Sequence, residues 1–296
     1  MTEKTDFQQS RNRGAILITS LWMLAILSIL AMGIGFRVSV EARLAKYNMD
    51  RLTALYLAKA GVVKSIYRLS RTPSVIDSIY ECGTVFSPEE KSDEAKIKAI
   101  FCSSLGAGSF NVGYTEDGRI YSGASDEERR ININTAPEEV LKNLLMYVGE
   151  DPTIASSIVQ WRSKGPGLDD GYYGALPAPY KCKHERFRAA EELILVKDMN
   201  KKIFDKIKNY ITVFGDAAKF AVNINTAPRA VLSTLITAFT GADKIAADIY
   251  ADRIITFRNG PDGEKGTKDD YFFTSDLSIE RVLPELSATQ AAELKK

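Results

Sequence analysis

Carboxylate side chains gather in two glycine-rich loops, and these residues are the ones best suited to chemistry. The first loop carries Asp169 and Asp170 after Gly165-Pro166-Gly167. The second spans residues 259–271, and its four carboxylates are Asp262, Glu264, Asp269 and Asp270. Calcium prefers six to eight oxygen ligands, and glycines allow the tight turns that supply them from side chains and carbonyl groups. Neither loop has the full EF-hand pattern, so a calcium site and a solvated acidic turn both stay open, with the second loop the stronger candidate.

The chain has three cysteines and one histidine, which limits its chemistry further. A disulfide between Cys82 and Cys102 would close a loop of about 21 residues and contribute roughly 3 kcal/mol in an oxidising compartment. Cys182 and His184 are two positions apart, but two ligands do not make a zinc site, and an idle or buried thiol is the alternative. Mechanisms that need two imidazoles are excluded, and we expect no enzymatic activity.

The charges of the chain are balanced, which argues against a nucleic-acid partner. Lys plus Arg total 39 against 38 for Asp plus Glu, a formal net charge of +1. The first fourteen residues account for that surplus, since they hold Lys4, Arg11 and Arg13 against Glu3 and Asp6. The remainder is therefore neutral, and no general basic surface exists to bind a phosphate backbone.

The loops belong to a chain whose N-terminal part contains a long apolar segment, which would anchor the chain in a membrane. Residues 15–36 contain no charged side chain, and at 1.5 Å per residue they form roughly 33 Å of helix, enough to span a bilayer. The apolar stretch exceeds the ~7–15 residues of a secretory signal, and no small-x-small cleavage site follows it. Positive charge before the span predicts that the leader stays in the cytoplasm and that the rest is exported. Apolar residues at helical spacing continue to about Ile66, so we expect one helix over 15–70, transmembrane over 15–36.

Beyond this helix the sequence predicts a small antiparallel sheet followed by helices. The segment FNVGYTEDGRIY alternates on both sides of Asp117-Gly118, which indicates a hairpin. A helix should start at Thr135 as its cap, with Pro137 in its first turn. Its buried face should hold Val140, Leu141, Leu144 and Leu145. Further helical patterns cover residues 151–161 and 189–211.

Two copies of one local motif occur in the chain. RININTAPEEVLKNLL from Arg130 and AVNINTAPRAVLSTLI from Ala221 share Ile-Asn, Thr-Ala-Pro and the apolar spacing that follows. Such units resemble helix-hairpin-helix modules, which bind DNA backbones through a Gly-x-Gly turn. The first candidate turn, residues 147–151, is acidic with one glycine, and the second, residues 196–200, has none. A membrane-tethered DNA-binding protein is therefore the alternative function, and a plain membrane-anchored scaffold is a third.

Several dispersed segments of the chain, and their order, resemble those of one family, the minor pseudopilins called protein K of the type II (general) secretion pathway. The basic leader that ends in Gly14 before an apolar helix is typical of prepilins. The similar segments are RGAILITSLWMLAILSILA from Arg13, VSVEARLA from Val38, ININTAP from Ile131, GLDDGYYGALPAPYK from Gly167, EELILVKDM from Glu191, YITVFG from Tyr210 and VNINTAPRAVL from Val222.

The resemblance implies an α+β fold and a place in a secretion machine. Prepilin peptidase would cut between Gly14 and Ala15, with methylation of the new N-terminus, and residues 1–14 would be the leader. Thr19 then stands at the fifth mature position, where most of the class has Glu. A glutamate buried in lipid is costly unless it meets the amino group of the subunit ahead, so a filament tip has no need of it. An ordinary tolerated hydroxyl is the alternative, because Thr can bond its own helix in lipid.

The domains implied by the resemblance are a pseudopilin-type α/β body from 71–130 and 216–296 and an inserted helical domain from 131–215. The helical domain could extend further toward the C-terminus. Family members usually continue past such a segment into closing strands, whereas this sequence ends at Lys296, so a truncated chain and an absence of the family's final strands both stay open. The helical domain of the family binds calcium and carries a D-D-x-Y element, which strengthens both loops as sites. The expected partners are other minor pseudopilins, the major pseudopilin and the inner-membrane secretion platform, with the soluble region in the periplasm.

Overall fold

The computed structural model describes residues 3–71, 101–106, 108–116, 119–216, 218–263, 265, 269–274 and 279–294. The chain divides into two compact units. The first comprises residues 1–60 and 104–110, and the second comprises 61–103 and 111–296. Each unit is described by itself.

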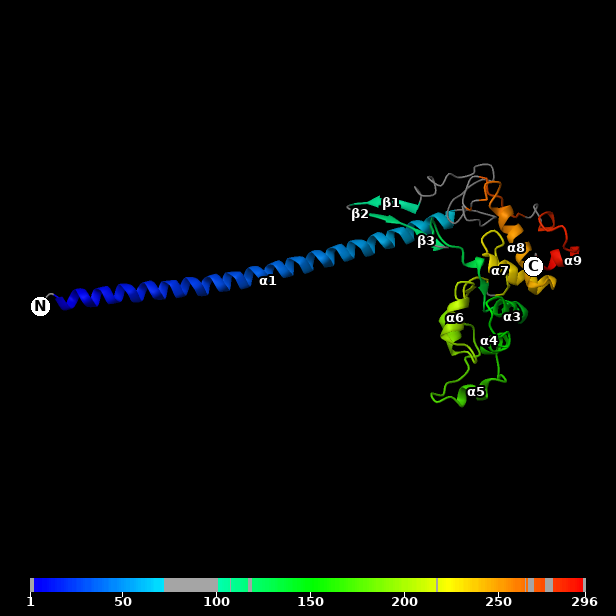
Figure 1. Ribbon diagram of the computed structural model, residues 1–296, viewed down its shortest axis with the longest axis horizontal. Coiled ribbons are helices and arrows are strands. Elements are labelled where there is room, and N and C mark those ends of the chain that lie inside the picture. Colours follow the sequence, from blue (N-terminus) through cyan, green and yellow to red (C-terminus); the bar gives the residue numbers. More distant parts are fainter. Residues whose placement is uncertain are drawn as a thin grey trace. The chain divides into compact units, whose positions relative to one another are not determined.

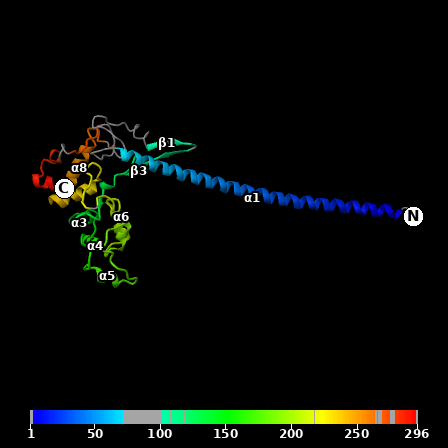
Figure 2. The same cartoon turned by 180° about the vertical axis from the view of Figure 1, so that it is seen from behind.

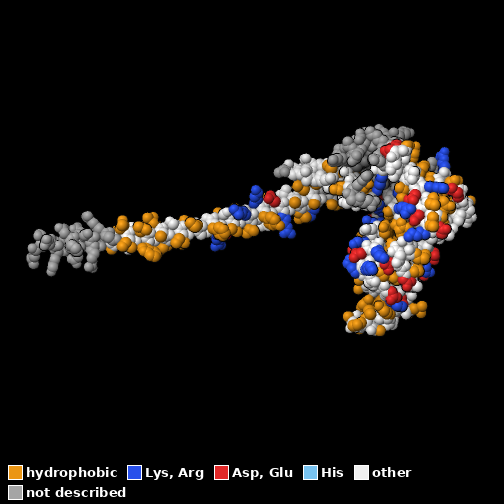
Figure 3. Space-filling model, in the orientation of Figure 1, with side chains coloured by type: hydrophobic (Ala, Val, Ile, Leu, Met, Phe, Trp, Pro, Cys, Tyr) orange, Lys and Arg blue, Asp and Glu red, His pale blue; other side chains and the backbone are white. Residues whose placement is uncertain are grey.

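Helix α1 runs without interruption from Glu3 to Arg71, which is 69 residues (Figure 1). The structure shows a helix over the predicted residues 15–70, and this helix begins earlier because residues 3–14 are helical as well. Within the described residues this is the one helix long and apolar enough to cross a membrane, with a mean hydropathy of 2.4 in its most apolar window. Figure 3 shows hydrophobic side chains over the first described part of α1 and charged ones only further along, where Arg37 pairs with Glu41 at 2.9 Å.

The few polar side chains of the apolar stretch are satisfied by their own helix. Thr19 Oγ1 donates to Ile16 O at 2.9 Å, Ser20 Oγ to Leu17 O at 2.9 Å, and Ser28 Oγ to Leu24 O at 2.8 Å. Because no hydroxyl is left without a partner, this segment can sit in hydrocarbon at little cost.

Two short antiparallel elements follow. Strand β1 (Cys102–Leu105) pairs with β2 (Gly108–Asn111), and β3 (Gly113–Glu116) pairs with β4 (Arg119–Ser122). The register Tyr114↔Tyr121 and Thr115↔Ile120 confirms the hairpin predicted around residues 117 and 118. In the first unit β2 lies against α1, since a Cβ at Gly108 would meet Leu57 Cδ1 at 2.4 Å.

A helical body makes up the described remainder of the chain. The turn η1 (Glu127–Arg129) leads into β5 (Ile131–Asn132), which pairs in parallel with β6 (Ile211–Thr212). Between these strands lie α3 (Glu138–Tyr147), α4 (Ile154–Arg162), α5 (Asp170–Gly174), η2 (Ala190–Leu195) and α6 (Lys201–Ile207). After β6 come α7 (Arg229–Thr240), α8 (Lys244–Arg258), η3 (Ile279–Arg281) and α9 (Ala288–Leu294).

These helices share one apolar core. Helix α3 packs against α4 and α7, and α7 packs against α8 and α9 (Figures 1 and 2). The predicted face of α3 is confirmed, because Val140, Leu141, Leu144 and Leu145 are all buried. The described part of 216–296 contains the helices α7, α8, η3 and α9. The exact domain boundaries stay a prediction.

Two local expectations need correction. Thr135 does not cap α3: the helix begins at Glu138 after Pro137, and no side chain caps it. The amides of Thr135 and Ala136 instead bond to Asn132 O at 3.1 and 2.8 Å, so a separate turn precedes the helix. The helical pattern over 189–211 is broken into η2 and α6, with Asp198 between them at φ 63°.

Candidate functional site

The repeated motif marks two copies of a larger unit. Each copy consists of N-x-N-T-A-P, two helices, an acidic loop and a returning segment: α3 and α4 in the first copy, α7 and α8 in the second. In both, the second asparagine donates its backbone N–H to the side chain of the first. These bonds are Asn134 N to Asn132 Oδ1 at 2.9 Å and Asn225 N to Asn223 Oδ1 at 3.0 Å.

An arginine at the end of the second helix fixes each motif. Arg258 Nη1 donates to Ile224 O at 2.8 Å and to Ala227 O at 2.9 Å. Arg162 donates in the same way to Ile133 O and Ala136 O. Burial lowers the pKa of Arg258 to about 10, so the guanidinium is still charged at neutral pH. Each arginine therefore satisfies two carbonyls that precede the first helix of its unit.

The second asparagine of each motif binds the segment that returns after the acidic loop. Asn225 accepts from Phe273 N at 2.7 Å and donates to Phe273 O at 3.1 Å. Asn134 accepts from Phe187 N at 2.8 Å and donates to Phe187 O at 3.0 Å. The two acidic loops thus occupy equivalent positions in the two units, each held between an arginine and a returning phenylalanine.

In the first loop, other groups of the chain already bind the carboxylates that were predicted as calcium ligands. Asp169 is buried, and its Oδ1 accepts from Lys197 Nζ at 2.7 Å. That hydrogen bond raises the pKa of Lys197. Asp170 Oδ2 accepts from Gly167 N at 3.0 Å, and its Oδ1 lies 2.9 Å from His184 Nε2. An ammonium group thus already compensates one of the two carboxylates proposed for calcium.

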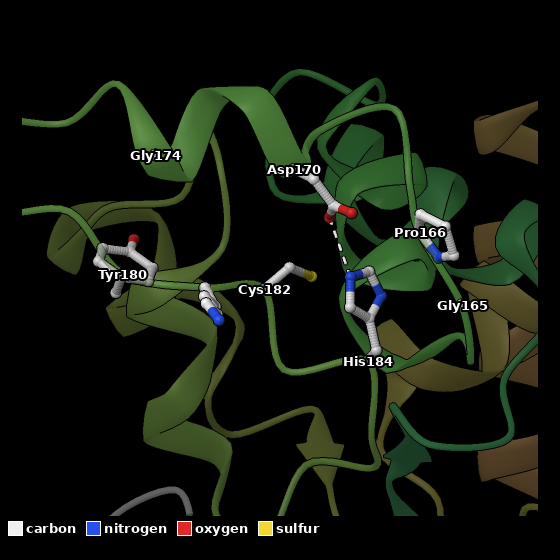
Figure 4. A pocket seen from close by; sticks show the side chains of 8 residues that line it. Gly165, Pro166, Asp170, Gly174, Tyr180, Cys182 and His184 are labelled. Atoms are coloured by element: carbon white, nitrogen blue, oxygen red, sulfur yellow. Dashed lines mark ion pairs between the residues drawn. The ribbon is translucent and has the colours of Figure 1, made fainter.

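Beside Asp170 lies a pocket of about 520 Å³. Figure 4 shows Asp170, Cys182 and His184 directed toward one another at its edge, with Gly174 and Tyr180 further along. From the sequence, Cys182 and His184 were judged too few for a zinc site. The third residue, Asp170, was not foreseen, because it lies twelve positions before Cys182 and only the returning segment brings them together.

In the second loop, the two ends are tied together and the backbone of Asp262 is bound to Asp269. Tyr271 N donates to Arg258 O at 3.0 Å, which closes the loop. Asp262 N donates to Asp269 Oδ2 at 3.0 Å, so two predicted ligands are neighbours. Gly260 adopts φ 68°, and a Cβ there would lie 2.2 Å from Asp269 O, so glycine is required. Asp270 is buried, and its negative charge opposes the lowering of the Arg258 pKa.

The types of donor in the second loop suit calcium better than those in the first. The second loop offers the carboxylates of Asp262, Asp269 and Asp270 and a glycine-rich backbone, which supply oxygen donors of the kind that calcium binds. Among the described residues, however, these three carboxylates do not gather around one point, and the group that does so is Asp170, Cys182 and His184. Glu264 lies outside the described residues. In the first loop, Lys197 sits on Asp169 and a thiol and an imidazole adjoin Asp170, so the set of donors differs. The calcium assignment stays a prediction for both loops.

The remaining predicted positions lie elsewhere. Gly14 and Ala15 fall within the backbone of α1, and Thr19 lies one turn further along it. Cys102 starts β1, and its thiol lies 3.1 Å from Asn111 Oδ1 as a hydrogen-bond donor. Cys82 lies outside the described residues, so the disulfide stays a prediction.

The fold defines a chain with one long apolar N-terminal helix, short antiparallel strands and two helical-hairpin units. Residues 110–216 match the family model described as type II secretion system (T2SS), protein K. A search of curated proteins finds no match. Among solved structures, the chain is similar to one in the crystal structure of the GspK-GspI-GspJ complex from the type 2 secretion system of enterotoxigenic Escherichia coli. That similarity has a TM-score of 0.55 at 14% identity and covers 85% of this chain and 82% of the other.

The family resemblance read from the sequence is therefore confirmed, and the chain carries a type II secretion protein K domain over residues 110–216. The predicted α+β fold, with its long apolar helix, small antiparallel strands and helical body, is confirmed as well.

Proposed function

We infer that this chain is a minor pseudopilin of a type II secretion system, which caps the periplasmic pseudopilus and helps to initiate it. The observation that carries the conclusion is the match of residues 110–216 to the protein K family. The similarity of fold over 85% of the chain supports it. The similar structure is a complex named for three components, GspK, GspI and GspJ. By extension, two other minor pseudopilins are the partners of this chain at the tip, and the major pseudopilin and the inner-membrane platform complete the assembly.

Helix α1 supports the proposed membrane topology. Its apolar residues from Ala15 onward form a single-pass anchor in the inner membrane, with the remainder of the chain in the periplasm. Cleavage between Gly14 and Ala15 would make Thr19 the fifth mature residue. Threonine has no carboxylate to offer a subunit ahead of it, and the Thr19 hydroxyl is satisfied within its own helix by Ile16 O. A subunit at the tip has no such neighbour, which suits the proposed place.

The proposed role is structural rather than enzymatic. In the acidic loops, Asp169 is bound to Lys197 and Asp269 to the amide of Asp262, which supports a role in holding these loops in place. Calcium in the second loop would hold Asp262, Asp269 and Asp270 together and stiffen the unit that Arg258 and Asn225 close.

The DNA-binding alternative is not supported. The turn between α3 and α4 holds Gly149 followed by Glu150, which pairs with Lys206. The turn between α7 and α8 holds Gly241 and then Asp243, whose carboxylate accepts from Ala246 N at 2.8 Å. An acidic side chain therefore stands at each of these two turns, where a phosphate would have to bind.

A secretion assay tests the function in cells. A strain that lacks this protein should retain its type II substrates in the periplasm, and the full chain supplied from a plasmid should restore their release. A variant with two charges in the span, Leu24→Lys with Leu27→Lys, should fail because α1 no longer inserts, while Asn209→Ala on the surface should work normally. Normal secretion in the strain without the protein would overturn the proposed role.

A further inference from the structure

Three potential metal ligands meet at the mouth of the pocket beside the first acidic loop. Asp170 stands at the start of α5, and Cys182 and His184 come from the segment that returns toward Phe187. One ligand atom from each, a carboxylate oxygen, Sγ and a ring nitrogen, lies within 4.8 Å of the others. Ligand atoms on a tetrahedral zinc ion lie roughly 3–4 Å apart, given bonds of about 2.0–2.3 Å. The cluster is therefore close to the size that one ion requires.

The hydrogen bonds of His184 direct one nitrogen toward the cluster. Nδ1 lies 3.1 Å from Ser163 O, and because a carbonyl only accepts, Nδ1 carries the proton. Nε2 then faces Asp170 Oδ1 at 2.9 Å. Two acceptors at this distance need a cation between them, either a second proton on the ring or a metal ion. A histidine that binds a metal typically donates its other N–H to a carbonyl, as His184 does here.

The backbone around the histidine supports this geometry. His184 has φ 51°, a left-handed conformation that is uncommon for a residue with a Cβ. Gly167, whose amide binds Asp170, would bring a Cβ to 3.7 Å from the His184 ring. The chain thus accepts local strain to place the imidazole against the carboxylate.

The chemistry of the three donors selects the class of ion. Sulfur, imidazole nitrogen and carboxylate oxygen together suit borderline divalent ions such as zinc or cobalt, whereas calcium takes oxygen only. Deprotonated Cys182 and Asp170 would carry two negative charges, which one divalent ion neutralises. Burial, and then the charge of Asp170, raise the pKa of the half-buried Cys182 thiol, so the metal must displace its proton on binding.

The pocket leaves room for a further ligand. Its volume of about 520 Å³ is bounded by Gly165, Pro166, Gly174 and Tyr180 beside the three donors (Figure 4). Three protein ligands with an open fourth position accept water. We propose that Asp170, Cys182 and His184 together bind one divalent transition-metal ion, zinc or cobalt, which fastens the returning segment to the first acidic loop.

The test uses the full chain in detergent, stripped of metal with a chelator and titrated with cobalt. One equivalent should bind and produce the near-ultraviolet charge-transfer band of a thiolate on cobalt, and zinc should displace it. Cys182→Ser should abolish the band, and Asp170→Asn and His184→Ala should each weaken binding at least tenfold. The matched control Cys102→Ser should behave as the wild type, and so should the double variant Asp269→Asn with Asp270→Asn in the other loop.

A measurement on the wild-type chain keeps the proposal testable if the variants unfold. Zinc should slow alkylation of Cys182 at least tenfold, as followed by mass spectrometry of its peptide, and should leave the alkylation of Cys102 unchanged. Absence of the cobalt band in the wild type, its persistence in Cys182→Ser, or equal alkylation of Cys182 with and without zinc would overturn the site. None of these readouts depends on the chain's role in secretion.

Discussion

Removing the Asn225 side chain should destabilise the second helical-hairpin unit strongly. Asn225 is 8% exposed, and Phe273, whose backbone it binds, is 7% exposed. Asn225→Ala leaves Phe273 N and Phe273 O without their partner in the interior. Each unsatisfied buried group costs about 1–3 kcal/mol, so with partial relaxation we expect a loss of about 2–4 kcal/mol in the free energy of unfolding.

Thermal unfolding of the full chain in detergent, followed by circular dichroism, measures this effect. For a domain of about 150–250 residues, 1 kcal/mol shifts Tm by roughly 2–4 °C, so Asn225→Ala should lower Tm by about 4–16 °C. Asn134→Ala should do the same in the first helical-hairpin unit, which contains α3 and α4, because Asn134 binds Phe187 in the same way. The matched control is Asn209→Ala on the surface, which should change stability by less than about 0.5 kcal/mol. An equally small shift for Asn225→Ala would refute the argument that this asparagine closes the unit.

Three further predictions concern the second helical-hairpin unit, which contains α7, α8 and the second acidic loop. Calcium at a hundredfold excess over Kd should stabilise the full chain by about 2.7 kcal/mol and so raise its Tm relative to chelator. The double variant Asp269→Asn with Asp270→Asn should lose most of this gain. An equal Tm of the wild type with calcium and with chelator would mean that the loop is a solvated acidic turn. Gly260→Ala should lower Tm even without calcium, because its Cβ would collide with Asp269 O, and an unchanged Tm would contradict the tight turn. The bidentate hydrogen bonds from Arg229 lower the pKa of Asp252, so this pair stabilises the fold above the unfolded pKa of about 3.9 and is lost as pH falls through the lower folded pKa. Because both side chains are more than a third exposed, Asp252→Asn should cost only up to about 1 kcal/mol at pH 6, and the cost should shrink as the pH falls below about 3.9 and Asp252 takes up its proton. A cost that does not shrink in acid would contradict the linkage.

Local patterns predicted the elements whose causes are local. The hairpin around β3 and β4 followed from alternation on both sides of an Asp-Gly pair, and the buried face of α3 followed from apolar spacing. The apolar span followed from its length alone. The cap was misplaced because Thr135 was judged by its residue type, whereas Asn132 organises that turn through its own carbonyl and side chain.

Contacts made by the segments that return after each acidic loop could not be predicted from the sequence pattern. The short motif was recognised as a repeat, but the whole unit was not, since Arg258 and Phe273 are single residues separated by loops whose lengths differ between the copies. The pairing of Asp169 with Lys197 was missed for the same reason, because 28 positions separate them. In each case a side chain meets a backbone group or a charge far along the chain, and no periodicity records it.

Assembly with two sister minor pseudopilins tests the central claim most directly. The three full-length proteins, expressed together and purified in detergent through a tag on this chain, should elute from size exclusion as one complex that contains all three and persists at about 0.15 M salt. Under the same conditions the chain alone should not retain DNA fragments. Elution of this chain without its sisters, together with retention of DNA, would contradict the account and restore the nucleic-acid alternative.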